Sequence, residues 1–195
     1  MAVFEKTGMG NRGWETGASF RSAAGTLTPI PPASRTEASA SALPFLAFLD
    51  VVRDAPLISI DLIVKNPANE VLLGLRRNEP AAGFWFVPGG RVLKNETLDA
   101  AFERLTQAEL GITRPRRDAL FYGVWEHFYG SNAGQVAGFG THYVVLAYQL
   151  MLDAAILCLP QAEQHQQYRW ALPETLADQA DVHHHTRVYF EQCTS

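Results

Sequence analysis

A glycine-containing loop that runs directly into an amphipathic helix constrains the fold of this chain more than any other feature. Residues 88–112 read Pro-Gly-Gly-Arg-Val-Leu-Lys-Asn-Glu-Thr-Leu-Asp-Ala-Ala-Phe-Glu-Arg-Leu-Thr-Gln-Ala-Glu-Leu-Gly-Ile. At about 100° per residue from Leu98, one apolar stripe collects Ala101, Phe102, Leu105, Ala108 and Ile112. Glu109 falls near the centre of this stripe, where a carboxylate needs a partner.

Two interpretations of Glu109 follow from the helix alone. A glutamate near the end of a helix commonly bends out to solvent. A negative charge in the last turn, however, opposes the helix dipole, and burying it unpaired is strongly unfavourable. A metal ion or an arginine beside Glu109 is therefore the favoured interpretation.

Composition is typical of a globular enzyme. A length of 195 residues suits one domain with some additional chain, and an apolar share of 47% can fill a core. The net charge is −4, whereas a nucleic-acid-binding protein normally has a basic face, so no nucleic-acid partner is expected. Two isolated cysteines, Cys158 and Cys193, fit a reducing compartment and predict a cytoplasmic protein, although one disulfide between them stays open.

The N-terminal part of the chain differs from the rest. Residues 26–42 are dominated by Gly, Ser, Ala, Thr and Pro and have no apolar period, so residues 1–41 are predicted to be a disordered extension and 42–195 the folded domain. The extension lacks the apolar core of a secretory signal, while its arginines and serines leave organelle targeting open. The apolar run at 143–152 is shorter than the roughly 20 residues of a membrane span, so no membrane partner is expected.

The remaining pattern alternates strands with a few helices. Helices are predicted at 45–52, 173–179 and 184–192, besides the central helix that follows Glu96 and stops at Gly111. Strands are predicted at 58–64, 71–76, 120–128 and 142–150, with a turn at 65–70 and a mobile loop at 130–140. The aromatic residues of the first helix either pack on the domain or across a homodimer, or form a membrane or partner face. Strands on both sides of a central helix, without regular βαβ alternation, predict an α/β fold of the α+β type with a mixed sheet.

The loop and helix resemble the Nudix box, whose pattern is G-x5-E-x7-R-E-U-x-E-E-x-G-U with U aliphatic. The matching positions are Gly90, Glu96, Arg104, Glu109, Gly111 and Ile112. Leu105 and Ala108 replace two glutamates that support metal binding, and Thr106 replaces an aliphatic residue. These departures resemble the GDP-mannose mannosyl hydrolase branch of the Nudix superfamily.

Segments outside the box resemble the same branch and extend the similarity from about residue 42 to the C-terminus. They are residues 56–61, 83–91, 121–129, 141–146 and 163–165. The resemblance implies the Nudix α/β/α sandwich with a mixed β-sheet, and it implies a homodimer.

The resemblance also implies a Mg²⁺ site. Its protein ligands would be the Gly89 carbonyl, the Glu109 carboxylate and Gln164, with waters or substrate phosphates in the remaining positions. The two missing glutamates suggest a single ion. One ion bridging a diphosphate suits stabilisation of a departing nucleoside diphosphate.

Six further residues receive roles by the same resemblance. His165 is the candidate general base, and Arg76 and Arg91 are candidate phosphate clamps. His127 and Tyr143 are expected to hold the diphosphate or leaving-group charge, and Asp61 the sugar hydroxyls or the developing cationic sugar. The residues alone favour a solvent-exposed His165 and surface positions for the arginines, and the others could be hydrogen-bonded core residues; the resemblance reverses the order for His165.

The remaining polar residues of interest are expected to be structural. Arg104 is predicted to pair with Glu109 or Glu103 and orient the metal ligand. Glu96 and Glu103 are predicted to cap or pair near the helix start. The histidine run 183–185 receives no role, because consecutive residues on a helix cannot all point the same way.

The sequence thus predicts a Mg²⁺-dependent enzyme that hydrolyses the nucleotide sugar GDP-mannose. Water would attack C1 of mannose with inversion and release GDP, and GDP-glucose would be a competing substrate. Two alternatives remain: a conventional Nudix pyrophosphohydrolase acting at phosphorus, and a catalytically silent nucleotide-sugar sensor.

Overall fold

The computed structural model describes residues 42–160 and 165–191. The predicted N-terminal extension, the proposed ligand Gln164 and Cys193 lie outside the described residues. Cys158 is exposed and is a free thiol.

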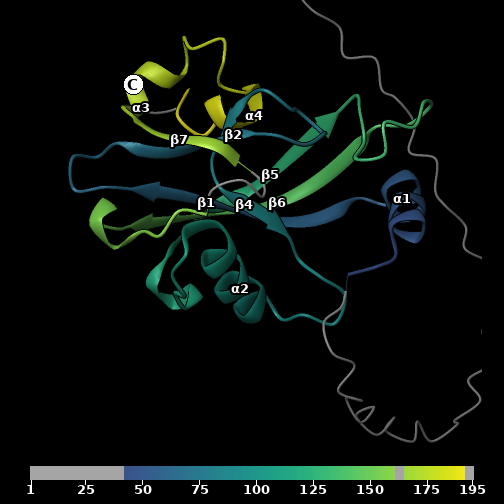
Figure 1. Ribbon diagram of the computed structural model, residues 1–195, viewed down its shortest axis with the longest axis horizontal. Coiled ribbons are helices and arrows are strands. Elements are labelled where there is room, and N and C mark those ends of the chain that lie inside the picture. Colours follow the sequence, from purple (N-terminus) through teal and green to yellow (C-terminus); the bar gives the residue numbers. More distant parts are fainter. Residues whose placement is uncertain (1–41, 161–164, 192–195) are drawn as a thin grey trace, which may run out of the picture. The chain divides into compact units, whose positions relative to one another are not determined.

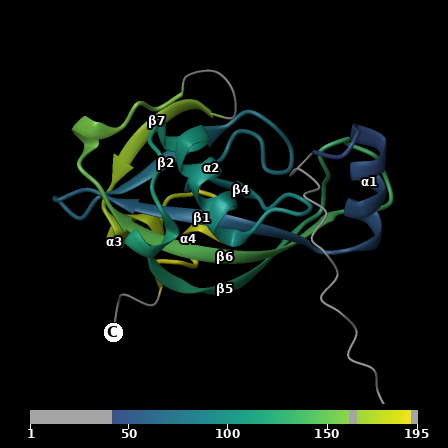
Figure 2. The same cartoon turned by 90° about the horizontal axis from the view of Figure 1, so that it is seen from below.

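The described residues form a mixed seven-stranded sheet. The strands are β1 (Leu57–Lys65), β2 (Val71–Arg76), β3 (Trp85–Phe86), β4 (Gly89–Arg91), β5 (Leu120–Tyr129), β6 (Thr141–Met151) and β7 (His165–Ala171). Their order is β3-β2-β1-β6-β5, with β4 also paired to β1 and β7 to β2. The long β1 and β6 strands are parallel and the other pairs are antiparallel. Figure 2 shows β1, β6 and β5 running side by side.

Helices cover both faces of this sheet. They are α1 (Phe45–Asp54), α2 (Leu98–Leu110), α3 (Pro173–Leu176) and α4 (His184–Arg187), with short 3₁₀ turns at Arg116–Asp118 and Ala154–Ile156. Helix α2 lies below the sheet and α3 and α4 lie above it (Figure 1). The predicted α/β/α sandwich with a mixed sheet is therefore confirmed. Within the described ranges, no helix is long and apolar enough to cross a membrane.

Alternation along β1 divides the core into two layers. Ile60, Leu62 and Val64 are fully buried on the α2 side, where they meet Phe102. Ile63 belongs to the opposite layer, beneath α3 and the residues around α4. On this second face, the first part of β1 carries the polar residues Ser59 and Asp61. These two residues line the site described below.

Both ends of α2 have clear local causes. The Thr97 hydroxyl accepts a hydrogen bond from the Ala100 amide (3.2 Å), and Gly111 ends the helix in the left-handed region at φ 70°. A Cβ at Gly111 would lie 2.1 Å from the Cys158 carbonyl oxygen, so only glycine fits there. Glu109 does not bend out to solvent, because its turn is packed on the sheet and only 2% of the residue is exposed.

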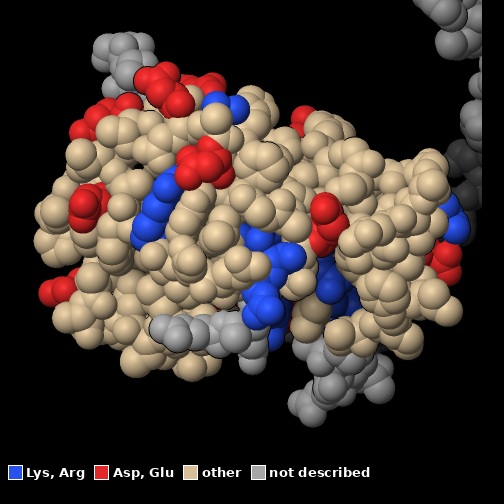
Figure 3. Space-filling model, turned by 45° about the horizontal axis from the view of Figure 1, so that its top comes forward, with Lys and Arg blue, Asp and Glu red and all other residues tan. Residues whose placement is uncertain are grey.

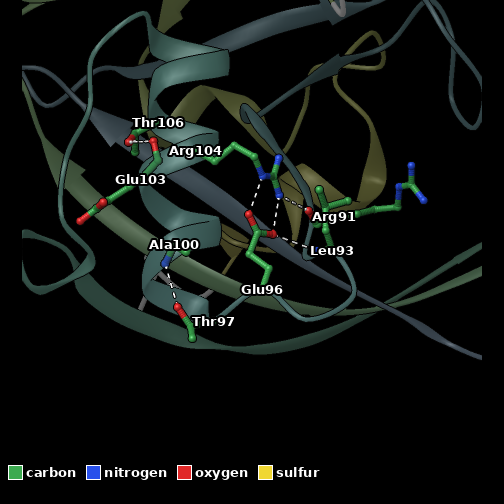
Figure 4. Close-up of polar contacts among 8 residues, drawn as sticks. All are labelled: Arg91, Leu93, Glu96, Thr97, Ala100, Glu103, Arg104 and Thr106. Atoms are coloured by element: carbon green, nitrogen blue, oxygen red, sulfur yellow. Dashed lines mark hydrogen bonds and ion pairs between the residues drawn. The ribbon is translucent and has the colours of Figure 1, made fainter. Parts of the chain in front are cut away.

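A bidentate ion pair joins α2 to the loop that precedes it (Figure 4). Arg104 Nε and Nη2 donate to Glu96 Oε1 (2.6 Å) and Oε2 (2.8 Å), and Nη2 also donates to the Arg91 carbonyl (2.8 Å). Glu96 Oε2 accepts a further bond from the Leu93 amide (2.9 Å). The pairing of Glu96 near the helix start is confirmed. The predicted partners of Arg104 are wrong, because the loop folds back onto the helix and brings Glu96 to it.

Two C-terminal helices are shorter than predicted. Helices expected at 173–179 and 184–192 are the single turns α3 and α4, and residue 192 lies outside the described residues. Beyond α4 the chain continues with i→i+3 bonds, Tyr189 N to Thr186 O (3.3 Å) and Phe190 N to Arg187 O (2.9 Å), because the buried aromatic side chains there pack against the sheet.

The predicted loop between β5 and β6 is organised by one buried side chain. Asn132 Nδ2 donates to the carbonyls of Val136 (2.7 Å) and Phe139 (2.9 Å), and its Oδ1 accepts from the Gly134 and Val136 amides (3.1 Å each). Four hydrogen bonds from a fully buried residue give residues 132–139 a defined shape.

The Glu96–Arg104 pair generates a stability prediction. We expect Glu96→Gln to lower the free energy of unfolding at pH 7 by about 1–3 kcal/mol, because it weakens a charge-assisted pair whose carboxylate is almost fully buried. The Arg104 side chain lowers the pKa of Glu96 below its ordinary 4.5. The carboxylate therefore stabilises the fold above pH 4.5, and this contribution is lost as the pH falls through the lowered pKa.

Urea denaturation of both proteins between pH 7 and pH 3 would measure the difference. Asp99→Asn, which removes the exposed pair with Arg116, is the control and should change stability by less than about 1 kcal/mol. A difference between wild type and Glu96→Gln that does not shrink in acid would contradict the role given to this pair.

Candidate functional site

One cavity gathers the residues that the sequence singled out. Its volume is about 270 Å³, and it opens between β1, β2, β4, β5, β6 and the first residue of β7, with α1 at its rim. Seven predicted site residues line it: Asp61, Arg76, Gly89, Arg91, His127, Tyr143 and His165. Gln164, the eighth, lies outside the described residues. Glu109, the ninth, lies behind His165.

Two arginines form a cationic wall of this cavity. The Arg91 guanidinium lies 3.8 Å from the ring centre of Phe48, and Arg76 lies 5.2 Å from that of Phe86. Burial lowers the pKa of Arg91, but an arginine stays protonated at neutral pH. Phe48 belongs to α1, so the expectation that this helix packs on the domain is confirmed for Phe48. Its neighbour Leu46 is 76% exposed.

A space-filling view shows basic side chains gathered in a hollow near the middle of one face (Figure 3). Acidic side chains lie mostly in the upper and left parts of that face, and some lie beside the hollow. A hollow of positive charge favours an anionic ligand.

A tyrosine connects two further groups that line the cavity. The Tyr189 hydroxyl donates to Asp61 Oδ2 (2.7 Å), and its oxygen lies 3.2 Å from His127 Nε2. Burial raises the pKa of Asp61 to about 6, against the opposing effects of Tyr189 and Arg76. Burial, with the neighbouring His185, lowers the pKa of His127 to about 3, so this imidazole is neutral at pH 7.

Tyr143 lies directly opposite His127 across the β5–β6 ladder. Burial raises the pKa of the Tyr143 phenol, so it faces the cavity as a neutral hydrogen-bonding group. The prediction that His127 and Tyr143 lie on strands facing one cleft is confirmed.

His165 and Glu109 form a buried pair at the end of the cavity. His165 Nε2 donates to Glu109 Oε2 at 3.1 Å, and the residues are 3% and 2% exposed. His165 begins β7 and pairs with Arg76 of β2, which removes it from the polar surface that the sequence alone favoured. Its Nδ1 is buried without a hydrogen-bond partner among the described residues. Both ring nitrogens are thus turned away from bulk solvent.

The donor set fits a hard, oxygen-preferring cation. The bonds from Leu62 N to Pro88 O and from Val92 N to Ile58 O flank the Ile60–Gly90 pair, so the alternation of an antiparallel ladder directs the Gly89 carbonyl away from β1. The Arg91 carbonyl points the same way and reaches Arg104 on α2. Gly89 therefore offers a carbonyl oxygen on the α2 side, and Glu109 offers a carboxylate from α2 itself.

Glu109 is the single acid that α2 brings to this place. Leu105 is buried and packs against Gly90, where a Cβ would lie 2.6 Å from Leu105 Cδ2. Ala108 and Glu103 are exposed, and Glu96 is engaged by Arg104. Among the described residues no three His, Cys, Asp or Glu side chains form a metal-binding group, so an ion here would rest on few protein oxygens.

Several residues of the site were not found from the sequence. Tyr189 has no local motif that marks it. His183 and His185, which received no role, stack on Phe86 (4.5 Å between ring centres) and on His127 (4.2 Å), while His184 is exposed. Glu79 lines the cavity and is fixed by Ser131 (2.8 Å).

The position of His165 generates a second stability prediction. A Cβ at Gly74 would lie 2.4 Å from His165 Nδ1 and 2.6 Å from Cγ, because β2 passes directly under the ring. We expect Gly74→Ala to displace the ring from Glu109 and to lower the free energy of unfolding by about 1–3 kcal/mol.

Gly130→Ala is the matched control for Gly74→Ala, since a Cβ there would have open space. Urea denaturation should show a change below about 0.5 kcal/mol for this variant. Equal stabilities of Gly74→Ala and Gly130→Ala would show that the ring does not occupy the space above Gly74.

Comparisons with known proteins agree with this architecture. The family model of the NUDIX domain matches residues 55–192. The low-salt glycan biosynthesis protein Agl8 of Haloferax volcanii is 44% identical over 104 residues, which are 53% of this chain and 64% of that protein, less than two thirds of its length.

Two solved structures share the fold. A MutT NUDIX hydrolase from Burkholderia pseudomallei is 26% identical, with a TM-score of 0.58 over 72% of this chain and 100% of that chain. The MutT protein from Methanosarcina mazei Go1 is 22% identical, with a TM-score of 0.57 over 71% and 94% of the two chains. Because the family model covers well over half of the sequence, this chain belongs to the Nudix hydrolase family.

Proposed function

We propose that this protein is a Mg²⁺-dependent glycosyl hydrolase that converts GDP-mannose and water to mannose and GDP. The observation that carries the proposal is one cavity that is lined by two arginines and by the hydrogen-bonding groups Asp61, His127 and Tyr143, beside a single buried acid. A nucleotide sugar has a diphosphate for the arginines and sugar hydroxyls for the hydrogen-bonding groups.

The arginines bind the anionic part of the substrate. Arg76 and Arg91 line the cavity from β2 and β4, which both pair with β1, and each lies against an aromatic ring, Phe86 or Phe48. Guanidinium groups offer paired donors to phosphate oxygens. Asp61 binds the sugar and stabilises the positive charge that develops at C1.

Mg²⁺ would be held by Glu109 and the Gly89 carbonyl, with Gln164 as a further ligand, and it would neutralise charge on the departing diphosphate. The fit is one of chemistry, since both described donors are oxygens that face the α2 side of β4. Glu109 is kept in place by His165 on one side and by its buried helix turn on the other.

The number of carboxylates that α2 brings to the site favours cleavage at carbon over cleavage at phosphorus. Activation of water at phosphorus commonly uses more than one metal ion, and several ions need several carboxylates. Helix α2 supplies one, because Leu105 and Ala108 carry no charge and Glu103 is exposed. A site with one ion is suited to the leaving group.

His165 is proposed as the general base for the attacking water. In the structure its Nε2–H is directed to Glu109. To act as the base, the imidazole must exchange this contact for water and carry its proton on Nδ1. Attack from the face opposite the diphosphate produces inversion at C1.

The similarity to a protein described as acting in glycan biosynthesis supports a sugar-containing substrate. A cytoplasmic location and a homodimer belong to the same proposal, as does GDP-glucose as a competing substrate.

Product analysis tests this function. Purified protein incubated with GDP-mannose and Mg²⁺ should release mannose and GDP in multiple turnovers, and proton NMR at early times should show the β-anomer. Mannose 1-phosphate and GMP would instead establish a pyrophosphohydrolase. Absence of turnover would favour a nucleotide-sugar sensor.

A pair of substitutions tests the role of His165. Glutamine can still donate an N–H to Glu109 but cannot accept a proton, whereas leucine can do neither. A general base predicts that His165→Gln and His165→Leu both lose about 10²–10⁴-fold in kcat. If His165 only orients Glu109, His165→Gln will retain most of the activity that His165→Leu loses.

A further inference from the structure

The C-terminal part of the chain supplies a buried tyrosine that contacts two residues of the cavity lining. Tyr189 lies just beyond α4, is 1% exposed, and reaches Asp61 of β1 and His127 of β5 with the same hydroxyl. Edge-on contact with Trp125 (5.0 Å between ring centres) and a bond from the Tyr122 hydroxyl to the Tyr189 carbonyl (2.7 Å) hold it there. The side chain has little freedom to choose other partners.

The hydroxyl of Tyr189 has one proton, and its two neighbours compete for it. The shorter bond, 2.7 Å, goes to the Asp61 carboxylate, which can only accept while it is ionised. The tyrosine oxygen is therefore left as an acceptor toward His127. At 3.2 Å, His127 Nε2 must carry the proton of this second bond.

The His127 ring is also fixed in orientation. His185 stacks on it with 4.2 Å between ring centres and 9° between planes. His185 is in turn anchored by its Nε2, which donates to the Phe128 carbonyl at 3.1 Å. With Nε2 committed to Tyr189, the neutral ring has its lone pair on Nδ1, and both His127 and Asp61 line the cavity.

We propose that Tyr189 is a positioning residue that makes both Asp61 and His127 hydrogen-bond acceptors toward the cavity, and thereby selects a hydroxyl-bearing group on this wall. An ionised diphosphate has no proton to give to either acceptor. A sugar has several. His127 consequently acts on the sugar, and the diphosphate is left to Arg76 and Arg91. The identity of this sugar rests on the proposed function, but the tautomer of His127 does not.

The first test is the tautomer itself. Long-range ¹H–¹⁵N NMR of the uniformly labelled full chain at pH 7.5, with His127 assigned by comparison with His127→Asn, should show a protonated Nε2 and an unprotonated Nδ1. In Tyr189→Phe the fixed tautomer should give way to a mixture. A proton on Nδ1 in the wild type would overturn the inference, and this measurement does not require that Tyr189→Phe folds.

The second test separates sugar binding from phosphate binding. Tyr189→Phe should reduce kcat/KM for GDP-mannose by about 10- to 100-fold, while the inhibition constant of GDP, which lacks the sugar, stays within about two-fold. Tyr148→Phe removes the hydroxyl of another buried tyrosine, one that bonds Arg116 and does not line the cavity, and it should leave both constants unchanged.

The outcomes distinguish this inference from the proposed function. An equal loss of GDP and GDP-mannose recognition in Tyr189→Phe would show that the tyrosine supports the whole cavity and would overturn the inference. If the wild type does not hydrolyse GDP-mannose, the proposed function fails. The inference is then tested by the tautomer of His127 and by calorimetry. It requires that Tyr189→Phe weakens the binding of GDP-mannose more than the binding of GDP.

Discussion

The buried contact between Glu109 and His165 is the interaction on which the site depends. It joins α2, which carries the acid, to β7, which carries the histidine, across a distance of 56 residues in sequence. A charge at that depth is tolerated only with a partner, so the pair fixes where the helix meets the sheet. Gly74 beneath the ring and Gly90 against Leu105 allow this approach, because side chains at either position would hold the elements apart.

Around this pair, different strands of the sheet contribute different kinds of side chain to the cavity. Arg76 and Arg91, from β2 and β4, line the cavity as cations, while Asp61 and His127, from β1 and β5, are joined by Tyr189. Glu96 and Arg104 hold β4, which carries Gly89 and Arg91, and the loop that follows it against α2. The Glu96–Arg104 pair thus lies outside the cavity but maintains the backbone that lines it.

Much of this arrangement was predictable from the sequence, and the failures have physical causes. The period of α2 and its terminal glycine gave the helix, and alternation gave β1, β2, β5 and β6, since local patterns determine such elements. The prediction of the partner of Arg104 was wrong, because the path of a loop, and not helical spacing, brings Glu96 to it. The polar neighbours of His165 indicated an exposed residue. Its burial results from the pairing of β7 with β2, which is a long-range contact that local sequence does not reveal. Tyr189 was missed for the same reason, since its partners are 62 and 128 residues away.

The central claim is that water attacks C1 of the sugar and not phosphorus. The product that carries the solvent oxygen after one turnover tests this claim directly. Hydrolysis of GDP-mannose in ¹⁸O-water, quenched before mannose exchanges its anomeric oxygen, should place the label in mannose and leave GDP unlabelled. Label in the phosphate of GMP or of mannose 1-phosphate would contradict the account, because it would show that a single buried acid on α2 suffices for attack at phosphorus.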